Sequence, residues 1–293
     1  MKEHKQKQKS DFHKVGILYH PKLPSARALA LELAQNLRES HRSAWTCSAW
    51  DEKRAVSKLE GCDLLLSIGG DGTVLRAARV ALEDGIPILG INMGRVGFMN
   101  ELSAEEARQK MPCLLSQSGR LEERAVLQTE VTPSKDGKSR PAKSTGPFYA
   151  LNDVVIARGG VARVIRVETR IDEDLFTTYK ADGVIIATAT GSTSYSMAVG
   201  GPILYPQSRE LILMPIAPHL TIGNPLVLSP EAKVELTVYS DRKAILSVDG
   251  QVDHALSDGD VVSISISSKT VKFLRFQPPG RFYSTVTQRL TRM

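Results

Sequence analysis

A turn of four residues, Gly69-Gly70-Asp71-Gly72, joins a short apolar run to an amphipathic segment. The run before it, Leu64–Ile68, has the length and the apolar character of a buried strand in a parallel sheet. Beyond the turn, Thr73 can cap a helix with one apolar face. That face would carry Val74, Ala77, Ala78, Ala81 and Leu82. A strand that passes into a helix through glycines predicts an α/β fold here.

The same order of strand and helix extends on both sides of the turn. Strands are predicted at 15–19, 64–68 and 86–91, and helices at 23–40, from Thr73 onward and at 104–115. This order implies a parallel sheet with helices on its faces. Ligands of such sheets bind beyond the carboxyl ends of the strands, where the glycine turn and residues 92–98, NMGRVGF, both lie.

After Gly119 the chain changes to shorter, alternating runs that predict antiparallel strands. The strand candidates are 125–131, 149–157, 161–171, 174–179, 183–188, 233–239, 243–248 and 261–267. Residues 132–147 are expected to form a polar hairpin loop, and a short helix is expected to begin near Ser194. We predict a disordered basic tail (1–13), an α/β nucleotide-binding domain (14–120), a β-rich domain (121–272) and a segment that packs on the first domain (273–293).

Composition excludes several classes of protein. The net charge of +6 is scattered and aromatic residues make up only 5% of the chain, so nucleic-acid binding is disfavoured and small anionic substrates are favoured. The three cysteines lack zinc or redox spacing and the histidines are scattered, which predicts no metal site built by the protein. No apolar run is long enough to span a bilayer. We expect a cytoplasmic protein with no membrane or nucleic-acid partner.

The carboxylate of Asp71 stands in a turn that otherwise suits a phosphate. Backbone N–H groups and the helix dipole attract anions at a helix N-terminus, and Asp71 would repel them. Magnesium, or a hydroxyl proton to be accepted, resolves the conflict, because an Asp accepts such a proton in phosphoryl transfer with a loose transition state. The turn matches neither a Walker A loop nor a dehydrogenase G-x-G-x-x-G. It therefore predicts phosphoryl transfer, with Gly69, Gly70, Gly72 and Thr73 around the phosphates; an ordinary structural turn is the alternative.

A second candidate site is the cluster Thr178–Pro206, in which an apolar strand enters a hydroxyl-rich turn around Gly191. Its hydroxyls suit a ribose and a diphosphate, and Tyr195 could stack on a base; a solvated loop is the alternative. A third is Asn152-Asp153, where an amide beside a carboxylate can hydrogen-bond an adenine edge and a ribose hydroxyl. By itself this pair reads more simply as an ordinary turn.

In this order, the motifs resemble those of the NAD kinases. The matching pieces are GGDGTVLRAAR, GINMGRVGFMNEL, LNDVVI, ADGVIIATATGSTSYSMAVGGPIL, IAPH and VDGQ. Lipid kinases and phosphofructokinases have similar glycine turns, but the long block at 182–204 is specific to NAD kinases. The resemblance implies a Rossmann-like α/β domain and a β-rich, NAD-binding domain. It also implies transfer of the ATP γ-phosphoryl group to the 2′-hydroxyl of the adenosine ribose of NAD, giving NADP, with Mg²⁺ as the cofactor.

The resemblance also assigns roles to individual residues. Asp71 matches the proton acceptor, Gly72 and Phe98 match residues that line the NAD pockets, and Arg76 lies near the phosphates. Contacts to the dinucleotide are implied for Asn152, Asp153, Arg163, Lys180, Asp182, Thr190, Thr193, Ser194, Tyr195, Ser196 and Gln251. Some of these are supplied across a subunit interface in the family, which implies a homodimer or homotetramer.

The sequence departs from the family pattern at a few positions, and it is compatible with two alternative functions. Many members of the family have Glu where this chain has Asp153, and STPTGST where it has Ala187 and Ala189 in ATATGST. A lipid or sugar kinase would share the glycine turn, and a non-catalytic NAD(P) sensor would share the binding residues. Asp71 argues against the sensor, because a protein that only binds a phosphate gains nothing from a carboxylate beside it.

Overall fold

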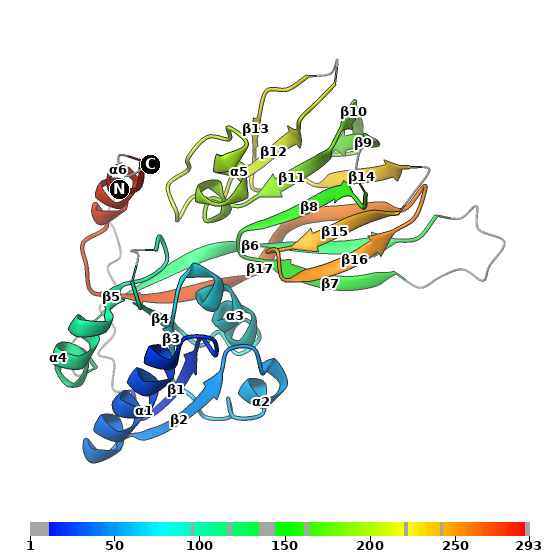
Figure 1. The fold of residues 1–293 in the computed structure, drawn as a ribbon. Helices are drawn as coiled ribbons and strands as arrows, with labels where there is room; N and C mark the ends of the chain where they lie inside the picture. The colour runs from blue at the N-terminus through cyan, green and yellow to red at the C-terminus, as the bar shows by residue number, and fades with distance from the viewer. Residues whose placement is uncertain are drawn as a thin grey trace. The chain divides into compact units, whose positions relative to one another are not determined.

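The computed structural model describes residues 12–94, 97–115, 119–134, 144–160, 164–219, 222–240 and 243–290 (Figure 1). The chain forms two compact units: the first comprises Met1–Glu123 and Lys269–Met293, and the second comprises Arg124–Ser268. Two strands, β6 (Arg120–Thr132) and β17 (Val261–Arg275), each begin in one unit and end in the other. Of the predicted tail, only Phe12 and His13 are described, and Phe12 is buried in the core of the first unit.

The first unit contains a parallel sheet in the order β2-β1-β3-β4. Its strands are β1 (Lys14–Tyr19), β2 (Ser43–Ser48), β3 (Leu64–Ile68) and β4 (Ile88–Asn92), with β5 (Leu102–Ser103) and the end of β17 also pairing with β4 in parallel. The helices are α1 (Pro24–Glu39), α2 (Glu52–Val56), α3 (Asp71–Ala81), α4 (Ala104–Leu114) and α6 (Arg281–Leu290). The predicted α/β domain with a parallel sheet is confirmed.

The strands of this sheet are apolar because both of its faces are buried. Ile17 and Leu66 pack in one core cluster with residues of α1 and α4, whereas Leu18 and Leu65, which point to the opposite face, are fully buried as well. Burying each such side chain stabilises the fold by about 1.5–3 kcal/mol. Strand β2 was not predicted, because SAWTCS lies at the sheet edge and lacks a clear apolar pattern.

The second unit consists of two antiparallel sheets. One contains β10-β9-β14-β17, with β6 beside β17 and β7 beside β6, and the other has the order β13-β12-β11-β8-β15-β16. Their bounds are β7 (Thr145–Ala150), β8 (Asp153–Arg158), β9 (Ile165–Ile171), β10 (Asp174–Ala181), β11 (Gly183–Ala187), β12 (Leu211–Ile216), β13 (Leu226–Leu228), β14 (Val234–Tyr239), β15 (Ala244–Val248) and β16 (Val252–Leu256). Val154 and Ile186 from one sheet share a core with Val167 and Leu236 from the other. The predicted β-rich domain is confirmed.

Several predicted elements of this unit differ from the structure. The strand predicted at 149–157 is two strands, β7 and β8, interrupted at Leu151-Asn152. Strand β12 was missed because it contains Pro215, a residue usually excluded from strands. The proline is tolerated because β13 pairs with Leu211, Ile212 and Leu213, and among the described residues no strand pairs with Pro215 on that side. Most of the predicted hairpin loop at 132–147 lies outside the described residues.

Candidate active site

The glycine turn connects β3 to α3 in the first unit. The helix begins at Asp71, so the prediction that Thr73 caps it is wrong: Gly70 is the N-cap residue. The backbone carbonyl of Gly70 accepts the N–H groups of Thr73 (2.9 Å) and Val74 (3.3 Å). A Cβ on Gly69 would lie 2.3 Å from Thr73 Oγ1, which restricts that position to glycine. Gly70 and Gly72 are exposed and have open space around them.

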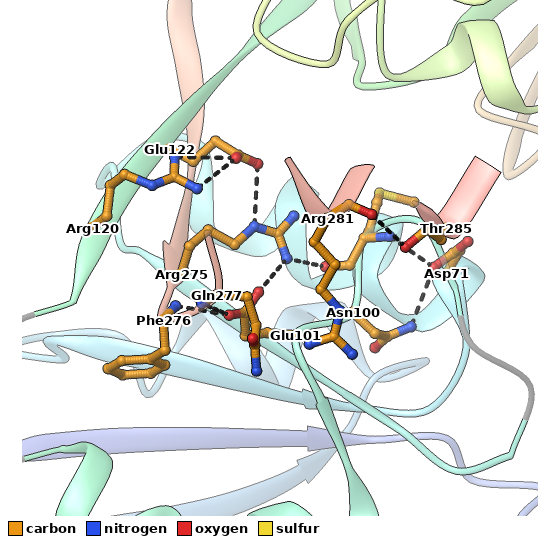
Figure 2. A network of polar contacts seen from close by, with 11 residues as sticks. Asp71, Asn100, Glu101, Arg120, Glu122, Arg275, Phe276, Gln277, Arg281 and Thr285 are labelled. Carbon is orange, nitrogen blue, oxygen red and sulfur yellow. Dashed lines mark hydrogen bonds and ion pairs between the residues drawn. The ribbon is translucent and has the colours of Figure 1, made fainter. Parts of the chain in front are cut away.

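The carboxylate of Asp71 is held by the loop that follows β4. Its Oδ2 accepts the backbone N–H of Phe98 at 3.0 Å, and its Oδ1 accepts the N–H of Met99 at 3.3 Å. Oδ1 also accepts a hydrogen bond from Asn100 Nδ2 at 3.2 Å (Figure 2). A Cβ on Gly97 would lie 2.0 Å from Oδ1, so the loop approaches this closely only with glycine there. The structure thus brings together Asp71 and Phe98, two predicted site residues from separate motifs. These donors from the loop hold the carboxylate of Asp71 in one orientation.

Arg76, also on α3, lies against an aromatic side chain that was not predicted. Its guanidinium is 4.3 Å from the ring centroid of Trp50, and the ring of His20 packs edge-on against the same tryptophan at 4.6 Å. Burial, and then the charge of the neighbouring Arg79, lower the pKa of Arg76 below its ordinary value. His20 follows β1 directly, and Trp50 follows β2 by two residues. Trp50 would have drawn attention as a strand-end residue had β2 been recognised.

The hydroxyl-rich turn follows β11 in the second unit and leads into a short 3₁₀ helix, Gly191–Thr193, and α5 (Tyr195–Ala198). Two of its hydroxyls hold the turn itself. Thr188 Oγ1 donates to Leu151 O (2.6 Å) and accepts the N–H of Gly191 (3.1 Å). Ser192 Oγ donates to Ala189 O (2.6 Å). These two hydroxyls are fully buried, so they stabilise the turn and are neither solvated nor available to a ligand.

The predicted ligand residues of this turn differ in accessibility. Thr190 is buried and accepts a hydrogen bond from Arg124 Nη1 at 3.1 Å. Ser196 is also buried, with its hydroxyl directed at Met214 Sδ (3.5 Å). Thr193 and Ser194 are half-buried, whereas Tyr195 is 43% exposed. Of these five residues, Tyr195 thus presents the most accessible surface for a ligand, whereas Thr190 and Ser196 are buried beneath the surface of the turn.

The Asn152-Asp153 pair is held by a residue that sequence reasoning missed. The carboxylate of Asp249 accepts the backbone N–H groups of Leu151 (2.9 Å), Asn152 (2.7 Å) and Asp153 (3.1 Å). Asp249 has a positive φ of 53°, which turns the chain after β15. The motif VDGQ contained this residue, but only Gln251 was singled out. Within the described residues, Asn152 Oδ1 is buried without a hydrogen-bond partner, so this amide has an acceptor available for a ligand.

Strand pairing gathers these groups at one end of a sheet. Asp153 pairs with Ala187 at the end of β11, and Val154 pairs with Val248 at the end of β15. The hydroxyl-rich turn, Asn152-Asp153 and Gln251 therefore lie at the same end of the second sheet. Asp153 is 5% exposed, and burial together with the charge of Asp249 raises the pKa of its carboxyl to about 7.

Two predicted residues lie away from this end of the sheet. Asp182 precedes β11, at the other end of the sheet, and forms an ion pair with Arg158 at 3.1 Å. Lys180 is exposed near the end of β10, a strand of the other sheet. Five residues of β11 separate Asp182 from the hydroxyl-rich turn, about 3.3 Å for each residue. The structure does not bring these two residues to Asn152, and Arg163 lies outside the described residues.

In the part of the chain that the structure describes, no three His, Cys, Asp or Glu side chains gather as metal ligands would. The helices of this part are all too short or too polar to cross a membrane.

Both units of the chain match family models of known proteins. The ATP-NAD kinase N-terminal domain model matches residues 5–118, and the ATP-NAD kinase C-terminal domain model matches residues 151–276. An NAD kinase of Dehalococcoides mccartyi is 44% identical over 95% of this chain and 96% of its own length. An NAD kinase of Chloroflexus aurantiacus is 36% identical over 95% of this chain and 99% of its own length.

Two solved structures share the fold. Yeast NADH kinase, solved with NADH, aligns over 96% of this chain and 88% of its own with a TM-score of 0.80 and 24% identity. An NAD kinase from Archaeoglobus fulgidus, solved with ATP, aligns over 94% of this chain and 98% of its own with a TM-score of 0.76 and 26% identity. With both domain models matched and relatives similar over nearly their whole length, the chain belongs to the ATP-NAD kinase family.

Proposed function

We propose that Asp71 is the proton acceptor when this member of the NAD kinase family phosphorylates NAD to NADP. The 2′-hydroxyl oxygen of the adenosine ribose attacks the γ-phosphorus of ATP, and its proton passes to the Asp71 carboxylate. The bond from the γ-phosphorus to the bridging oxygen breaks, and ADP leaves with that electron pair. One observation carries the assignment: the Asp71 carboxylate is oriented by donors from Phe98, Met99 and Asn100 while it stands beside exposed glycines.

The glycine turn is proposed to hold phosphate groups. Gly70 and Gly72 leave open space where side chains would otherwise stand, so a phosphate can approach the backbone at the start of α3. Arg76 supplies a cation on the same helix. The Archaeoglobus fulgidus relative was solved with ATP, which supports an ATP donor for this chain.

The second unit is proposed to bind the adenosine half of NAD. Asn152 Oδ1 can accept a hydrogen bond from the adenine amino group, because within the described residues it is buried without another partner. Tyr195 offers an exposed ring on which a base can stack. Asp153, Thr193, Ser194 and Gln251 supply polar groups at the same end of the sheet. The NADH bound to the yeast relative supports this assignment.

Mg²⁺ is proposed to arrive with ATP. It keeps several waters and uses substrate phosphates with one or two carboxylates, so it needs no cage of protein ligands. The described residues fit this use, since the glycine turn offers one carboxylate and no group of three metal-binding side chains gathers among them. When bound, Mg²⁺ neutralises phosphate charge during transfer.

A homodimer or homotetramer in the cytoplasm completes the proposal. Asp182 precedes β11 at the end of the sheet opposite Asn152, and Lys180 lies two residues earlier, in β10 of the other sheet. Side chains so placed suit a dinucleotide held by another copy of the chain, as the family resemblance implies for these positions and for Arg163.

The decisive experiment is NADP formation from NAD, ATP and Mg²⁺ by wild type and by Asp71→Asn. Loss of an acceptor of a reacting proton lowers turnover by about 100-fold or more, and NAD affinity, measured by calorimetry, should change little. Parallel loss of binding and turnover would count against Asp71 as the base. NAD binding without turnover in either protein would favour the sensor, and phosphorylation of diacylglycerol or fructose 6-phosphate would favour the lipid or sugar kinase.

A further inference from the structure

Arg275, the last residue of β17, is buried in the first unit within a small charged cluster. Its Nε donates to Glu122 Oε1 at 3.1 Å, and its Nη1 lies 3.3 Å from Glu101 Oε2. Arg120 completes the cluster with two contacts of 3.2 Å to Glu122 Oε2 (Figure 2). The cluster thus contains two guanidinium groups and two carboxylates, so its positive and negative charges are equal in number.

Glu101 is fixed independently of Arg275. Its Oε1 accepts the backbone N–H groups of Phe276 at 2.7 Å and Gln277 at 2.6 Å, and its own backbone N–H donates to Gly90 O at 2.8 Å. Glu101 therefore ties the chain after β17 to β4. Its other oxygen receives Arg275, whose planar, permanently charged fork is set in one orientation as a result.

The same guanidinium reaches the loop that holds Asp71. Arg275 Nη1 donates to the carbonyl oxygen of Met99 at 2.8 Å. The backbone N–H of Met99 in turn donates to Asp71 Oδ1 at 3.3 Å, and the next residue, Asn100, supplies a further donor to the same oxygen. One residue, Met99, thus lies between a buried guanidinium and the carboxylate of Asp71.

We propose that Arg275 is a positioning residue for Asp71, acting through the Met99 backbone. The inference rests on the proposed role of Asp71 as proton acceptor. If the Met99 carbonyl is released, the two N–H donors and the Asn100 amide no longer hold the carboxylate in one place. Misplacement of a reacting group by about 1 Å lowers turnover by about 100-fold, whereas ground-state binding of nucleotides depends much less on it.

The cluster offers a matched control. Arg275→Lys and Arg120→Lys make the same chemical change against the same Glu122, but only Arg275 contacts Met99. A single ammonium keeps the charge balanced and cannot occupy the positions of both Nε and Nη1. We expect Arg275→Lys to lower kcat about tenfold or more with KM for NAD and ATP within about twofold. Arg120→Lys should leave kcat within about twofold of wild type.

A double-mutant cycle separates positioning from general damage. If Arg275 acts through Asp71, adding Arg275→Lys to Asp71→Asn should cause no further loss in the residual kcat, measured with radiolabelled ATP over long incubations. A multiplicative loss, or equal losses for Arg275→Lys and Arg120→Lys, would overturn the positioning role. If Arg275→Lys proves insoluble, Arg275→Gln combined with Glu122→Gln removes one charge of each sign and takes its place.

The two proposals fail in different ways. Wild-type kcat for Arg275→Lys, beside a large loss for Asp71→Asn, overturns the positioning role alone. Full turnover by Asp71→Asn overturns the assignment of the base, and the positioning role with it.

Discussion

Asp249 holds the backbone of Asp153 and at the same time raises the pKa of its side chain. The Asp249 carboxylate accepts the Asp153 N–H at 3.1 Å, and burial together with this second charge raises the pKa of Asp153 from 3.8 to about 7. The turn that presents Asn152 therefore depends on two carboxyl groups close together. A proton on Asp153 removes the repulsion between them.

Stability should consequently depend on pH through Asp153. Between pH 3.8 and about pH 7, the Asp153 carboxyl keeps its proton in the folded chain and has lost it in the unfolded chain. The free energy of unfolding therefore declines across this window as the pH rises. The slope is at most about 1.4 kcal/mol per pH unit for one group. Asp153→Asn removes this dependence, so its unfolding free energy should fall less than that of wild type between pH 5 and about pH 8. Urea unfolding at several pH values tests this, with the exposed Asp174→Asn as control. Identical pH profiles for wild type and Asp153→Asn would contradict it.

Gly191→Ala should destabilise the second unit. A Cβ there would lie 2.0 Å from Asn152 O, a backbone atom that also accepts the N–H of Thr188. Overpacking of this kind lowers the free energy of unfolding by about 1–3 kcal/mol. Gly160→Ala is the control, because its Cβ would meet nothing within 4 Å. Chemical denaturation distinguishes the two, and equal stability of both variants would show that the turn adapts.

Gly97→Ala should impair catalysis more than folding. The added Cβ would stand 2.0 Å from Asp71 Oδ1 and must displace either the carboxylate or the loop. We expect kcat to fall about tenfold or more, with NAD affinity retained. Gly94→Ala, in the same loop but with open space around its Cβ, should behave as wild type. Steady-state kinetics on both variants provide the measurement; an unchanged kcat for Gly97→Ala would mean that the position of Asp71 matters little.

Phe282→Ala should weaken NAD binding. The ring of Phe282 on α6 lies 6.5 Å from that of Phe98, centroid to centroid, and so limits where Phe98 can stand. Aromatic pairs of this kind contribute about 0.5–1.5 kcal/mol. We expect KM for NAD to rise by about two- to tenfold with kcat nearly unchanged. Gln288→Ala, an exposed position on the same helix, serves as control. A KM for NAD equal to that of wild type would show that Phe282 does not affect NAD binding.

Local patterns predicted the elements that bury apolar side chains in a regular period. β3 and its glycine turn could be recognised because five buried residues precede three glycines within four positions. Helix α1 was recognisable by its apolar face. Helix α6 was not, because most of its described side chains are exposed or half-buried.

The residues that hold the candidate site in place could not be predicted from the sequence, for a different reason. Asp249 acts by collecting backbone N–H groups about 97 residues away, and Arg275 reaches Met99 across 176 positions. Neither contact follows from spacing or periodicity, because each depends on strand order. Trp50 was missed with β2, although its place beyond a strand end is the place where ligands of α/β sheets are sought.

The division of the first unit in the sequence has a consequence for biosynthesis. Leu274 belongs to the core around β1, β3 and α1, yet it leaves the ribosome only after all of the second unit has been made. Domains generally fold as units during synthesis. The second unit can therefore complete its sandwich while the first still lacks a core residue and the arginine next to it. Until β17 has emerged and paired with β4, Arg275 cannot contact Met99, so the newly made chain completes this part of the candidate site last.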